Sequence, residues 1–510
     1  MSDRDGPVRP VAPAIARYAG LTGAVLLSVA GWLGGALPGA PANSSLLDIW
    51  RAPHGPAVLG CWLAGTVLLV GAWWSLRWGP PSTRWAYLTA GLWVLPLLAA
   101  PPMGSRDVYS YACQGWSWVH GVDPYRVGVA AAGCPWTDTV SPIWRDTPAP
   151  YGPVFVLLAG LAVLLGGGLT GTIVLLRVAA VAGVLLAALC LPGLARVVGV
   201  PTRRAAWLAL ACPLVGVHLV AGTHNDAVGL GLLLFGLLVL VRRPGNPWAL
   251  LVAGVLLGLA VAVKAFAVVV LPFAALAAVR GRYTVRALLR AAGWLAGGVA
   301  AALLVTSLAT GLGLGWVGGL AHSGESQQWT SPPTAVGFVI NYVGALFGRE
   351  PQAVPVVRVV ALAVLAVLLV VLWWRAWTAL RGLGNVRQRV VRLAAARPRV
   401  ALAGAGLALG ATVLLAPVFH PWYAIWPLAV LAVATVSLAR TVWFVAPCAV
   451  AAVLTLPDGA SLARFTKAPG AILMTALVVA VMVRAVRTGL ARHARERRGH
   501  PAPPPSARAG

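Results

Sequence analysis

Long apolar runs fill most of this chain, and short polar segments separate them. Runs of about 17–24 residues recur along it and match a bilayer hydrocarbon core about 30 Å thick. Because the runs are continuous and do not alternate, they predict helices and not barrel strands. The sequence predicts an all-α polytopic membrane protein with about fourteen transmembrane helices, near 18–37, 55–76, 85–101, 170–192, 205–220, 226–241, 248–263, 265–279, 286–308, 352–374, 401–418, 422–439, 441–457 and 468–487.

Two stretches in this pattern need a decision. Residues 248–279 are too long for one span and carry Lys264 in the middle, so we expect a tight hairpin with the lysine at its turn. Residues 151–168 are apolar enough to cross, but a crossing there would place four strongly basic loops outside. Arginine-rich short loops normally face the cytoplasm. We therefore expect 151–168 to be a juxtamembrane or half-inserted helix and both termini to be cytoplasmic.

The charge supports membrane topology and not nucleic-acid binding. The formal net charge is +27, but only Lys264 and Lys467 are lysines, and most arginines flank apolar runs. We divide the chain into an N-terminal tail, three spans, an outer loop with its juxtamembrane helix, the remaining spans with their outer loops, and a basic Pro/Ala-rich tail. These five parts cover 1–17, 18–100, 101–168, 169–487 and 488–510.

The acidic residues gather on the outer side of this predicted topology. Apart from three in the tails, each falls in an outer loop or at an outer helix end: Asp48, Asp107, Asp123, Asp138, Asp146, Asp226, Glu325, Glu350 and Asp458. The positive-inside rule says little about acids, so this distribution is separate information. It predicts an extracytoplasmic site for charged chemistry.

The polar loop after the third predicted span holds the first candidates. Asp107, in SRDVYSYACQG, is either a solvated carboxylate at a helix start, where Ser105 or Asp107 is the N-cap, or a reactive carboxylate beside Tyr109 and Tyr111. Asp123, in HGVDPYRVG with Tyr125, is either a turn former or a sugar ligand. In an oxidising exterior, Cys113 and Cys134 either form a disulfide or remain free thiols.

Candidate cations follow at about the same membrane depth. Lys264 lies alone in a long apolar stretch, where it either snorkels to the surface or binds a lipid phosphate. Arg177 and Arg358 lie near the outer ends of their spans, and Arg106 precedes Asp107. Few acids lie at this depth to pair with such cations, so a phosphate ligand is expected.

Polar and aromatic residues of the other outer turns are candidate sugar ligands. The turn His224, Asn225 and Asp226 either caps two helices or binds hydroxyls. Two further clusters have carbohydrate-binding composition, although an interfacial aromatic belt would explain the rings of the second. They contain Glu325 and Trp329 in HSGESQQWTSPPT, and His420, Trp422 and Tyr423 in FHPWYAIWP.

These motifs together resemble a known family. The motifs are DVYSY…DPY, APYGPVF, LLRVAAVAGVLL, the HND turn, GLAVAVKAFAVVVLPF and HPWY. With them, roughly residues 85–440 resemble the GT-C superfamily of polyprenyl-phosphate-sugar glycosyltransferases. More narrowly they resemble the actinobacterial MptB-type polyprenol-phosphomannose-dependent α-1,6-mannosyltransferases. The resemblance implies that Asp107 is catalytic and that 151–168 follows the catalytic loop. Two extra spans precede that loop here.

The residues suit this chemistry without a cofactor or metal. A phosphate leaving group needs no general acid, one carboxylate suffices as base, and cations stabilise the departing phosphate. The expected partners are a polyprenyl-phosphate sugar donor, a mannan or glycolipid acceptor and the bilayer, in lipomannan-type cell-envelope synthesis. Alternatives are transfer of another polyprenyl-phosphate sugar such as arabinose, a lipid-linked sugar transporter or flippase, and a structural scaffold. A transporter would be expected to show inverted repeats, which the sequence lacks.

Overall fold

The computed structural model describes residues 12–40, 45–384, 390–435 and 438–498. Within these ranges the chain is helical, with one isolated antiparallel bridge between Thr455 and Ser461. Seven described helices are long and apolar enough to cross a bilayer, which makes this a membrane protein. They are α1 (Pro13–Gly34), α3 (Gly55–Ser75, continued by η1, Leu76–Trp78), α7 (Leu169–Val198), α12 (Val285–Thr310), α15 (Ala353–Gly384), α16 (Val390–Leu415) and α20 (Lys467–Arg498).

Shorter helices fill the space between these seven. The longer ones among them are α4 (Thr83–Ala99), α5 (Asp107–Val119), α6 (Pro153–Gly166), α8 (Thr202–Leu210), α9 (Asp226–Arg242), α10 (Pro247–Val263), α11 (Leu271–Ala278), α14 (Pro332–Leu346), α17 (Ile425–Ala434) and α18 (Leu438–Ala452). Short turns of helix are α2 (Leu46–Arg51), α13 (Trp316–Gly319), α19 (Leu462–Phe465), η2 (Thr137–Thr139), η3 (Pro142–Trp144), η4 (Val215–Ala221), η5 (Ala265–Val270), η6 (Leu320–Glu325) and η7 (Pro421–Ala424).

The structure confirms the all-helical class but not the count of about fourteen spans. By length and composition the described residues provide seven spans, or eight if α8 and η4, bent by 59°, form one. Several predicted spans are only 8–17 residues long, such as α9, α10, α11 and α17. A straight crossing needs about 20 residues. The tail expected from 488 is helical as far as Arg498, and the residues beyond lie outside the described part.

The predicted break at Lys264 is present. Lys264 has an extended backbone between α10 and the 3₁₀ turn η5, so the helix stops and restarts there. The backbone N–H of Gly245 donates to Ala278 O at 2.9 Å, which brings the far ends of α10 and α11 together. The stretch 247–278 is therefore a hairpin with the lysine at its closed end.

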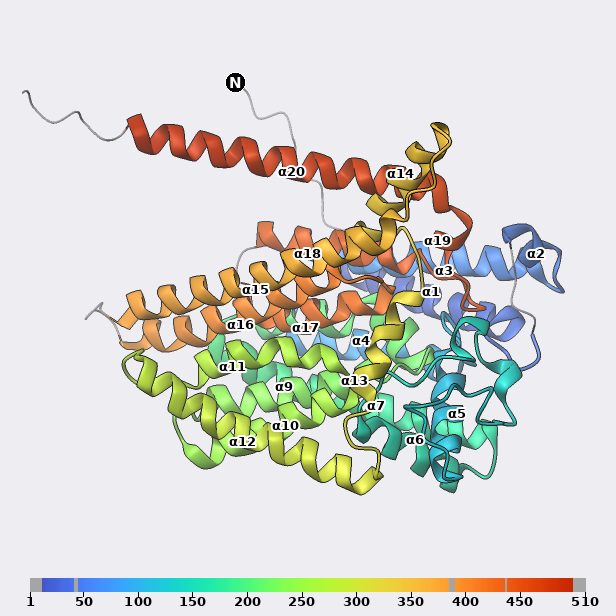
Figure 1. The fold of residues 1–510 in the computed structure, drawn as a ribbon, viewed down its shortest axis with the longest axis horizontal. Coiled ribbons are helices and arrows are strands. Elements are labelled where there is room, and N and C mark those ends of the chain that lie inside the picture. The colour runs from blue at the N-terminus through green and yellow to red at the C-terminus, as the bar shows by residue number, and fades with distance from the viewer. Residues whose placement is uncertain (1–11, 41–44, 385–389, 436–437, 499–510) are drawn as a thin grey trace, which may run out of the picture.

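The polar loop lies at one end of the helical bundle. Figure 1 places α5 and α6 at the end opposite the free C-terminal end of α20. The N–H of Gly152, just before α6, donates to Val263 O at 3.4 Å, so the start of α6 meets the end of α10 beside Lys264. At 14 residues, α6 is too short to span a bilayer upright, as expected for a juxtamembrane helix.

Close helix contact fixes where α9 begins. A Cβ on Gly183 of α7 would lie 2.4 Å from the backbone oxygen of Ala227 on α9, so only glycine permits this approach. The contact sits one residue after Asp226, the first residue of α9. Helix packing therefore positions the His224-Asn225-Asp226 turn against α7.

Candidate active site

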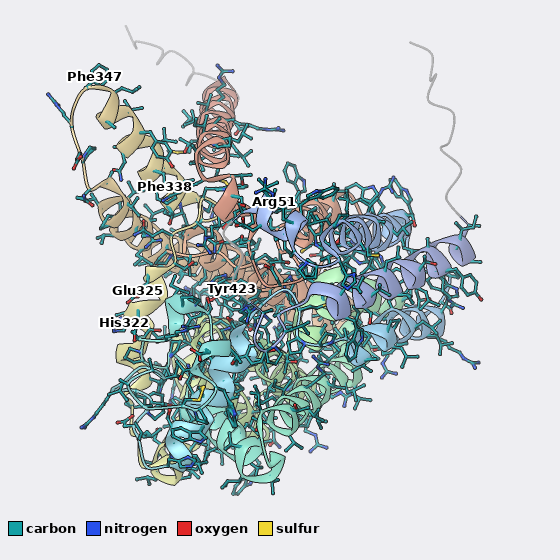
Figure 2. The ribbon with its side chains drawn as sticks, turned by 90° about the vertical axis from the view of Figure 1, so that its right-hand side faces the viewer. Arg51, His322, Glu325, Phe338, Phe347 and Tyr423 are labelled. Atoms are coloured by element: carbon teal, nitrogen blue, oxygen red, sulfur yellow. A yellow bond between two sulfur atoms is a disulfide. The ribbon has the colours of Figure 1, made fainter. Side chains whose placement is uncertain are left out.

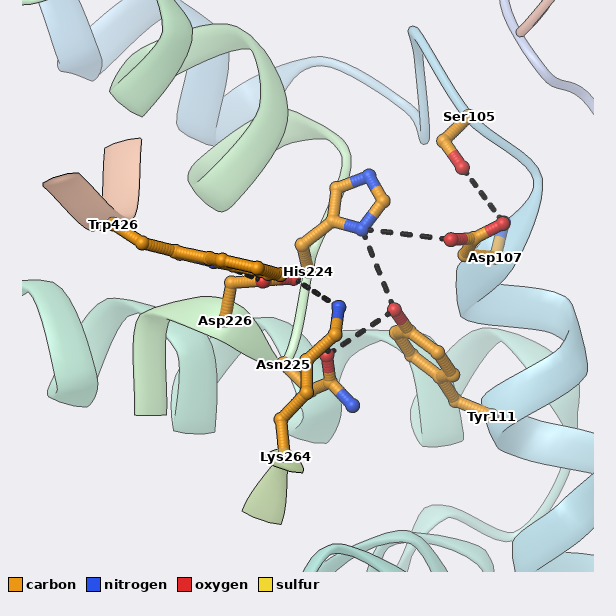
Figure 3. Close-up of polar contacts among 8 residues, drawn as sticks. All are labelled: Ser105, Asp107, Tyr111, His224, Asn225, Asp226, Lys264 and Trp426. Atoms are coloured by element: carbon orange, nitrogen blue, oxygen red, sulfur yellow. Dashed lines mark hydrogen bonds and ion pairs between the residues drawn. The ribbon is translucent and has the colours of Figure 1, made fainter. Parts of the chain in front are cut away.

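Asp107 begins helix α5 and points into the site (Figure 3). Its backbone N–H donates to Ser105 Oγ at 3.0 Å, so the serine hydroxyl satisfies one of the free N–H groups at the start of the helix, whose N-cap residue is Arg106. The Asp107 side chain is 16% exposed. Burial raises its pKa from 3.8 to about 6, and nearby Lys264 opposes that rise. Near neutral pH this carboxylate is ionised and is a stronger proton acceptor than an ordinary aspartate.

The His224-Asn225-Asp226 turn faces Asp107 across the site. His224 Nδ1 lies 3.7 Å from Asp107 Oδ2 and 3.3 Å from the Tyr111 hydroxyl oxygen. The Tyr111 hydroxyl also donates to Asn225 Oδ1 at 3.5 Å. Burial lowers the pKa of His224 well below 6.5, so its ring is neutral. The Tyr111 hydroxyl therefore links His224, which lies beside the Asp107 carboxylate, to the side-chain amide of Asn225.

Lys264 forms an ion pair with Asp226 on the other side of this turn. Its Nζ lies 2.8 Å from Asp226 Oδ2 and 3.4 Å from Asn225 Oδ1. Asp226 is fully buried, and its second oxygen accepts from Trp426 Nε1 at 2.6 Å. Few acids were expected at the depth of Lys264, and one of them, Asp226, begins a helix directly beside the hairpin turn and pairs with the lysine.

Aromatic rings enclose the lysine. Lys264 Nζ lies 5.6, 5.2 and 5.7 Å from the ring centroids of Tyr151, Tyr423 and Trp426, within cation–π range. Figure 2 shows Tyr423 within the body of the molecule. The ammonium is therefore held in a low-dielectric cage with its side chain 12% exposed.

A stack of rings continues from His224. Trp422 stacks on His224 with centroids 3.9 Å apart, and His420 stacks on Trp422 at 4.7 Å. Burial lowers the pKa of His420 to about 3, so it too is neutral. The HPWY turn thus packs on the HND turn, and the structure brings these two sequence motifs together.

The three candidate arginines donate to the protein itself. Each guanidinium is at least half-buried and bonds mainly to backbone oxygens. The acceptors are the carbonyls of Leu37, Ala40 and Thr139 for Arg106; the carbonyls of Leu98, Ala100 and Ala221 with Thr223 Oγ1 for Arg177; and the carbonyls of Gly324 and Ser326 with Thr334 Oγ1 for Arg358. None of these hydrogen bonds joins an arginine to Lys264 or to the rings around it.

Two of the candidate sugar ligands in the loop have structural contacts. Asp123 Oδ1 accepts from the Tyr125 backbone N–H at 2.8 Å, and Oδ2 lies 3.3 Å from Arg126 Nε, so the turn interpretation has geometric support. The Tyr109 hydroxyl donates to Ala36 O. Tyr125 is buried, and its hydroxyl has no partner among the described residues.

The HSGESQQWTSPPT cluster contributes a more exposed surface. His322 Nδ1 lies 2.9 Å from Glu325 Oε1, with both side chains about half exposed. Figure 2 places this pair at the edge of the molecule. Trp329 Nε1 donates to Thr466 Oγ1 at 3.1 Å. None of these contacts joins the cluster to Asp107.

A disulfide links Cys113 of α5 to Cys134 of the loop, with sulfurs 2.05 Å apart. It ties the loop to the helix that carries Asp107.

Within the described residues, no group of three or more His, Cys, Asp or Glu side chains is arranged to hold a metal ion.

Sequence reasoning missed two residues of the site. Tyr151 and Trp426 line the lysine cage. Tyr151 is the first residue of the stretch 151–168, which was expected to form a juxtamembrane helix. Trp426 follows Trp422 by four residues, so helical spacing placed it on the same face.

Comparison with known proteins identifies the family. A model of the alpha-(1→6)-mannopyranosyltransferase N-terminal domain matches residues 17–280, and a model of the MptB C-terminal domain matches 333–484. No solved structure gives a significant match.

Individual relatives match this chain over most of its length and most of theirs. The chain is 34% identical over 451 residues to a probable alpha-(1→6)-mannopyranosyltransferase of Mycolicibacterium smegmatis, covering 82% of this chain and 78% of the relative. Two alpha-(1→6)-mannopyranosyltransferases of Mycobacterium tuberculosis are 31% and 33% identical, and the matches cover 82% and 81% of this chain and 78% and 79% of the relatives. This chain belongs to the alpha-(1→6)-mannopyranosyltransferase family and is a membrane mannosyltransferase.

Proposed function

We propose that the protein transfers mannose from polyprenyl-phosphomannose to the 6-hydroxyl of an α-1,6-mannan or glycolipid acceptor, with inversion at the sugar carbon. The observation that carries this proposal is the placement of a largely buried carboxylate, Asp107, and an enclosed cation, Lys264, against the same His224-Asn225-Asp226 turn. A carboxylate with pKa about 6 suits proton abstraction, and a caged ammonium suits a phosphate leaving group.

Asp107 is the base in this reaction. As the acceptor oxygen attacks the anomeric carbon, its hydroxyl proton passes to the Asp107 carboxylate. The bond between the anomeric carbon and the phosphate oxygen breaks, and its electron pair remains on polyprenyl phosphate. A β-linked donor attacked from the opposite face gives an α-mannoside. Phosphate is already a good leaving group, so the step requires no general acid.

Lys264 is the cation that faces the departing phosphate. An ammonium has three donors, and two of them are directed at Asp226 and Asn225. The third is available to a phosphate oxygen. The Lys264 charge also acts on Asp107, where it limits the rise in the carboxyl pKa. The two ends of the scissile bond would thus lie between groups that already interact electrostatically.

The neighbouring polar groups suit a sugar. Asn225 Nδ2 and His224 Nε2 are buried and have no hydrogen-bond partner in the described residues. Leaving a buried donor unpaired is costly, which favours a ligand hydroxyl at this place.

The donor reaches the site from the bilayer in this proposal. Leu161, Leu164 and Leu165 of α6 are 51%, 63% and 68% exposed, so the helix presents an apolar side to lipid. The same helix begins beside Lys264. We place this end of the bundle on the extracytoplasmic side, because the positive-inside rule assigns the arginine-rich loops to the cytoplasm. With α8 and η4 counted as an eighth crossing, both termini lie in the cytoplasm.

The test is transfer by the purified full-length protein in liposomes. Labelled polyprenyl-phosphomannose and a short α-1,6-mannan should give a lengthened mannan whose new linkage is α-1,6 by NMR. Polyprenyl-phosphoarabinose and GDP-mannose serve as comparison donors. Use of either in preference to polyprenyl-phosphomannose, or a β-linked product, would contradict the proposal. Movement of the lipid-linked sugar across the liposome bilayer without a new linkage would favour a flippase.

A further inference from the structure

The backbone before His224 has a conformation that its residues do not favour. Residues Val215–Ala221 form a full π-helical turn, a form that occurs rarely and mostly at functional sites. Thr223 then has φ +58°, in the left-handed region that a β-branched residue strongly disfavours. Such a turn persists only if its surroundings hold it.

Arg177 of α7 holds this turn. Its Nε donates to Thr223 Oγ1 at 3.2 Å, and its NH2 donates to Ala221 O at 2.9 Å. Its NH1 donates to Leu98 O at 3.2 Å and to Ala100 O at 2.5 Å. One guanidinium thus joins the strained turn to the end of α4, from which the chain runs directly into Asp107.

The fork geometry explains why this position is an arginine. Four hydrogen bonds leave the planar guanidinium toward two separate segments, which a lysine ammonium cannot reproduce. Because these bonds go to three backbone oxygens and the Thr223 hydroxyl, the guanidinium binds the protein itself and not an incoming phosphate.

We infer that Arg177 is a positioning residue that sets the separation between the Asp107 carboxylate and the His224-Asn225-Asp226 turn with its bound Lys264. The inference rests on the proposed function, because it assigns a residue to the same reaction. A displacement of about 1 Å between reacting groups can lower a rate about 10²-fold. Arg177 therefore acts on turnover while making no contact with the donor.

The experiment compares Arg177→Lys, Arg177→Gln, Thr223→Gly and Arg177→Gln/Thr223→Gly in the reconstituted full-length protein. Arg399→Gln is the matched control, because Arg399 also clamps a carbonyl, Val198 O, at the opposite end of α7. The readouts are kcat, binding of polyprenyl phosphate, the pH profile, and amide hydrogen–deuterium exchange over 215–226.

Both Arg177 variants should lose kcat about 10²-fold, while polyprenyl phosphate binding changes by less than about 3-fold. Exchange over 215–226 should rise in these variants and not in Arg399→Gln. Opening the turn admits water to Asp107, so the acidic limb of the pH profile should move below 6. Thr223→Gly removes the unfavourable conformation, so the loss on adding Arg177→Gln should be smaller in that background than in the wild type.

Two results would overturn the inference. One is full kcat for Arg177→Lys together with weakened polyprenyl phosphate binding for Arg177→Gln, which would make Arg177 a phosphate ligand. The other is unchanged exchange over 215–226 in Arg177→Gln. The exchange measurement needs no turnover, so it decides the inference even if the wild type fails to use polyprenyl-phosphomannose, a failure that would refute the proposed function instead.

Discussion

Removing the Lys264 ammonium should destabilise the protein more than removing both members of its ion pair. In Lys264→Met the fully buried Asp226 carboxylate keeps its hydrogen bond from Trp426 but loses its only described cation. Leaving one partner of a buried pair uncompensated typically costs about 3–5 kcal/mol. We expect a loss in this range for the single variant.

The companion variants separate charge from packing. Asp226→Asn should cost less than Lys264→Met, because the ammonium is 12% exposed and keeps Asn225 and three aromatic rings. Lys264→Met/Asp226→Asn should recover most of the loss, because neutral replacement of a buried pair is often close to neutral in stability. Lys467→Met is the control, because Lys467 is the only other lysine in the sequence. Its ammonium lies 4.4 Å from the Phe338 ring centroid, a cation–π contact whose loss should cost about 1 kcal/mol.

The assay is equilibrium unfolding in mixed detergent micelles, followed by the fluorescence of the 23 tryptophans. A double variant at least as unstable as Lys264→Met would refute the reasoning, because the single variant's loss would then come from packing. A loss for Lys467→Met as large as that for Lys264→Met would refute it as well.

Three further predictions concern Asp107 and its supports. Because the pKa of Asp107 is raised to about 6, kcat/KM should fall about tenfold per pH unit below 6 and level off above it; a limb near 4 in a pH–rate profile would contradict this. Tyr111→Phe should lower kcat about tenfold, because it removes the hydroxyl between His224 and Asn225 while keeping the ring; unchanged steady-state kinetics would show that the link is unnecessary. Cys113→Ser/Cys134→Ser should cost about 3 kcal/mol, since the bridge closes a 21-residue separation, whereas Cys61→Ser should cost little; free thiols at 113 and 134 by mass spectrometry would contradict the bridge.

Features that depend on local sequence could be predicted. One lysine in an overlong apolar stretch predicted the hairpin break at Lys264, because a charge cannot remain in the bilayer centre at low cost. The length of 151–168 and the surrounding arginines likewise predicted a short helix beside the loop. The count of about fourteen spans is not confirmed, because apolar composition does not reveal where a helix ends or bends, as in the short helices α9, α10, α11 and α17.

The assembly of the site could not be predicted. Asp107, His224, Lys264 and Trp426 come from four distant segments, and hydropathy does not say which outer turns meet. The contacts of the arginines could not be predicted either. Arg177 suggests an anion by its charge alone, but its partners are mostly backbone carbonyls, which every residue carries and no sequence pattern marks.

Single-turnover transfer by Asp107→Asn tests the central claim most directly. The variant keeps the shape of the side chain and loses the base, so mannosyl transfer from polyprenyl-phosphomannose should fall by about 10²–10⁴-fold. Asp138→Asn, on an exposed loop carboxylate, is the control and should keep wild-type transfer. Near wild-type transfer by Asp107→Asn, in protein that folds and binds polyprenyl phosphate normally, would show that another group takes the acceptor proton.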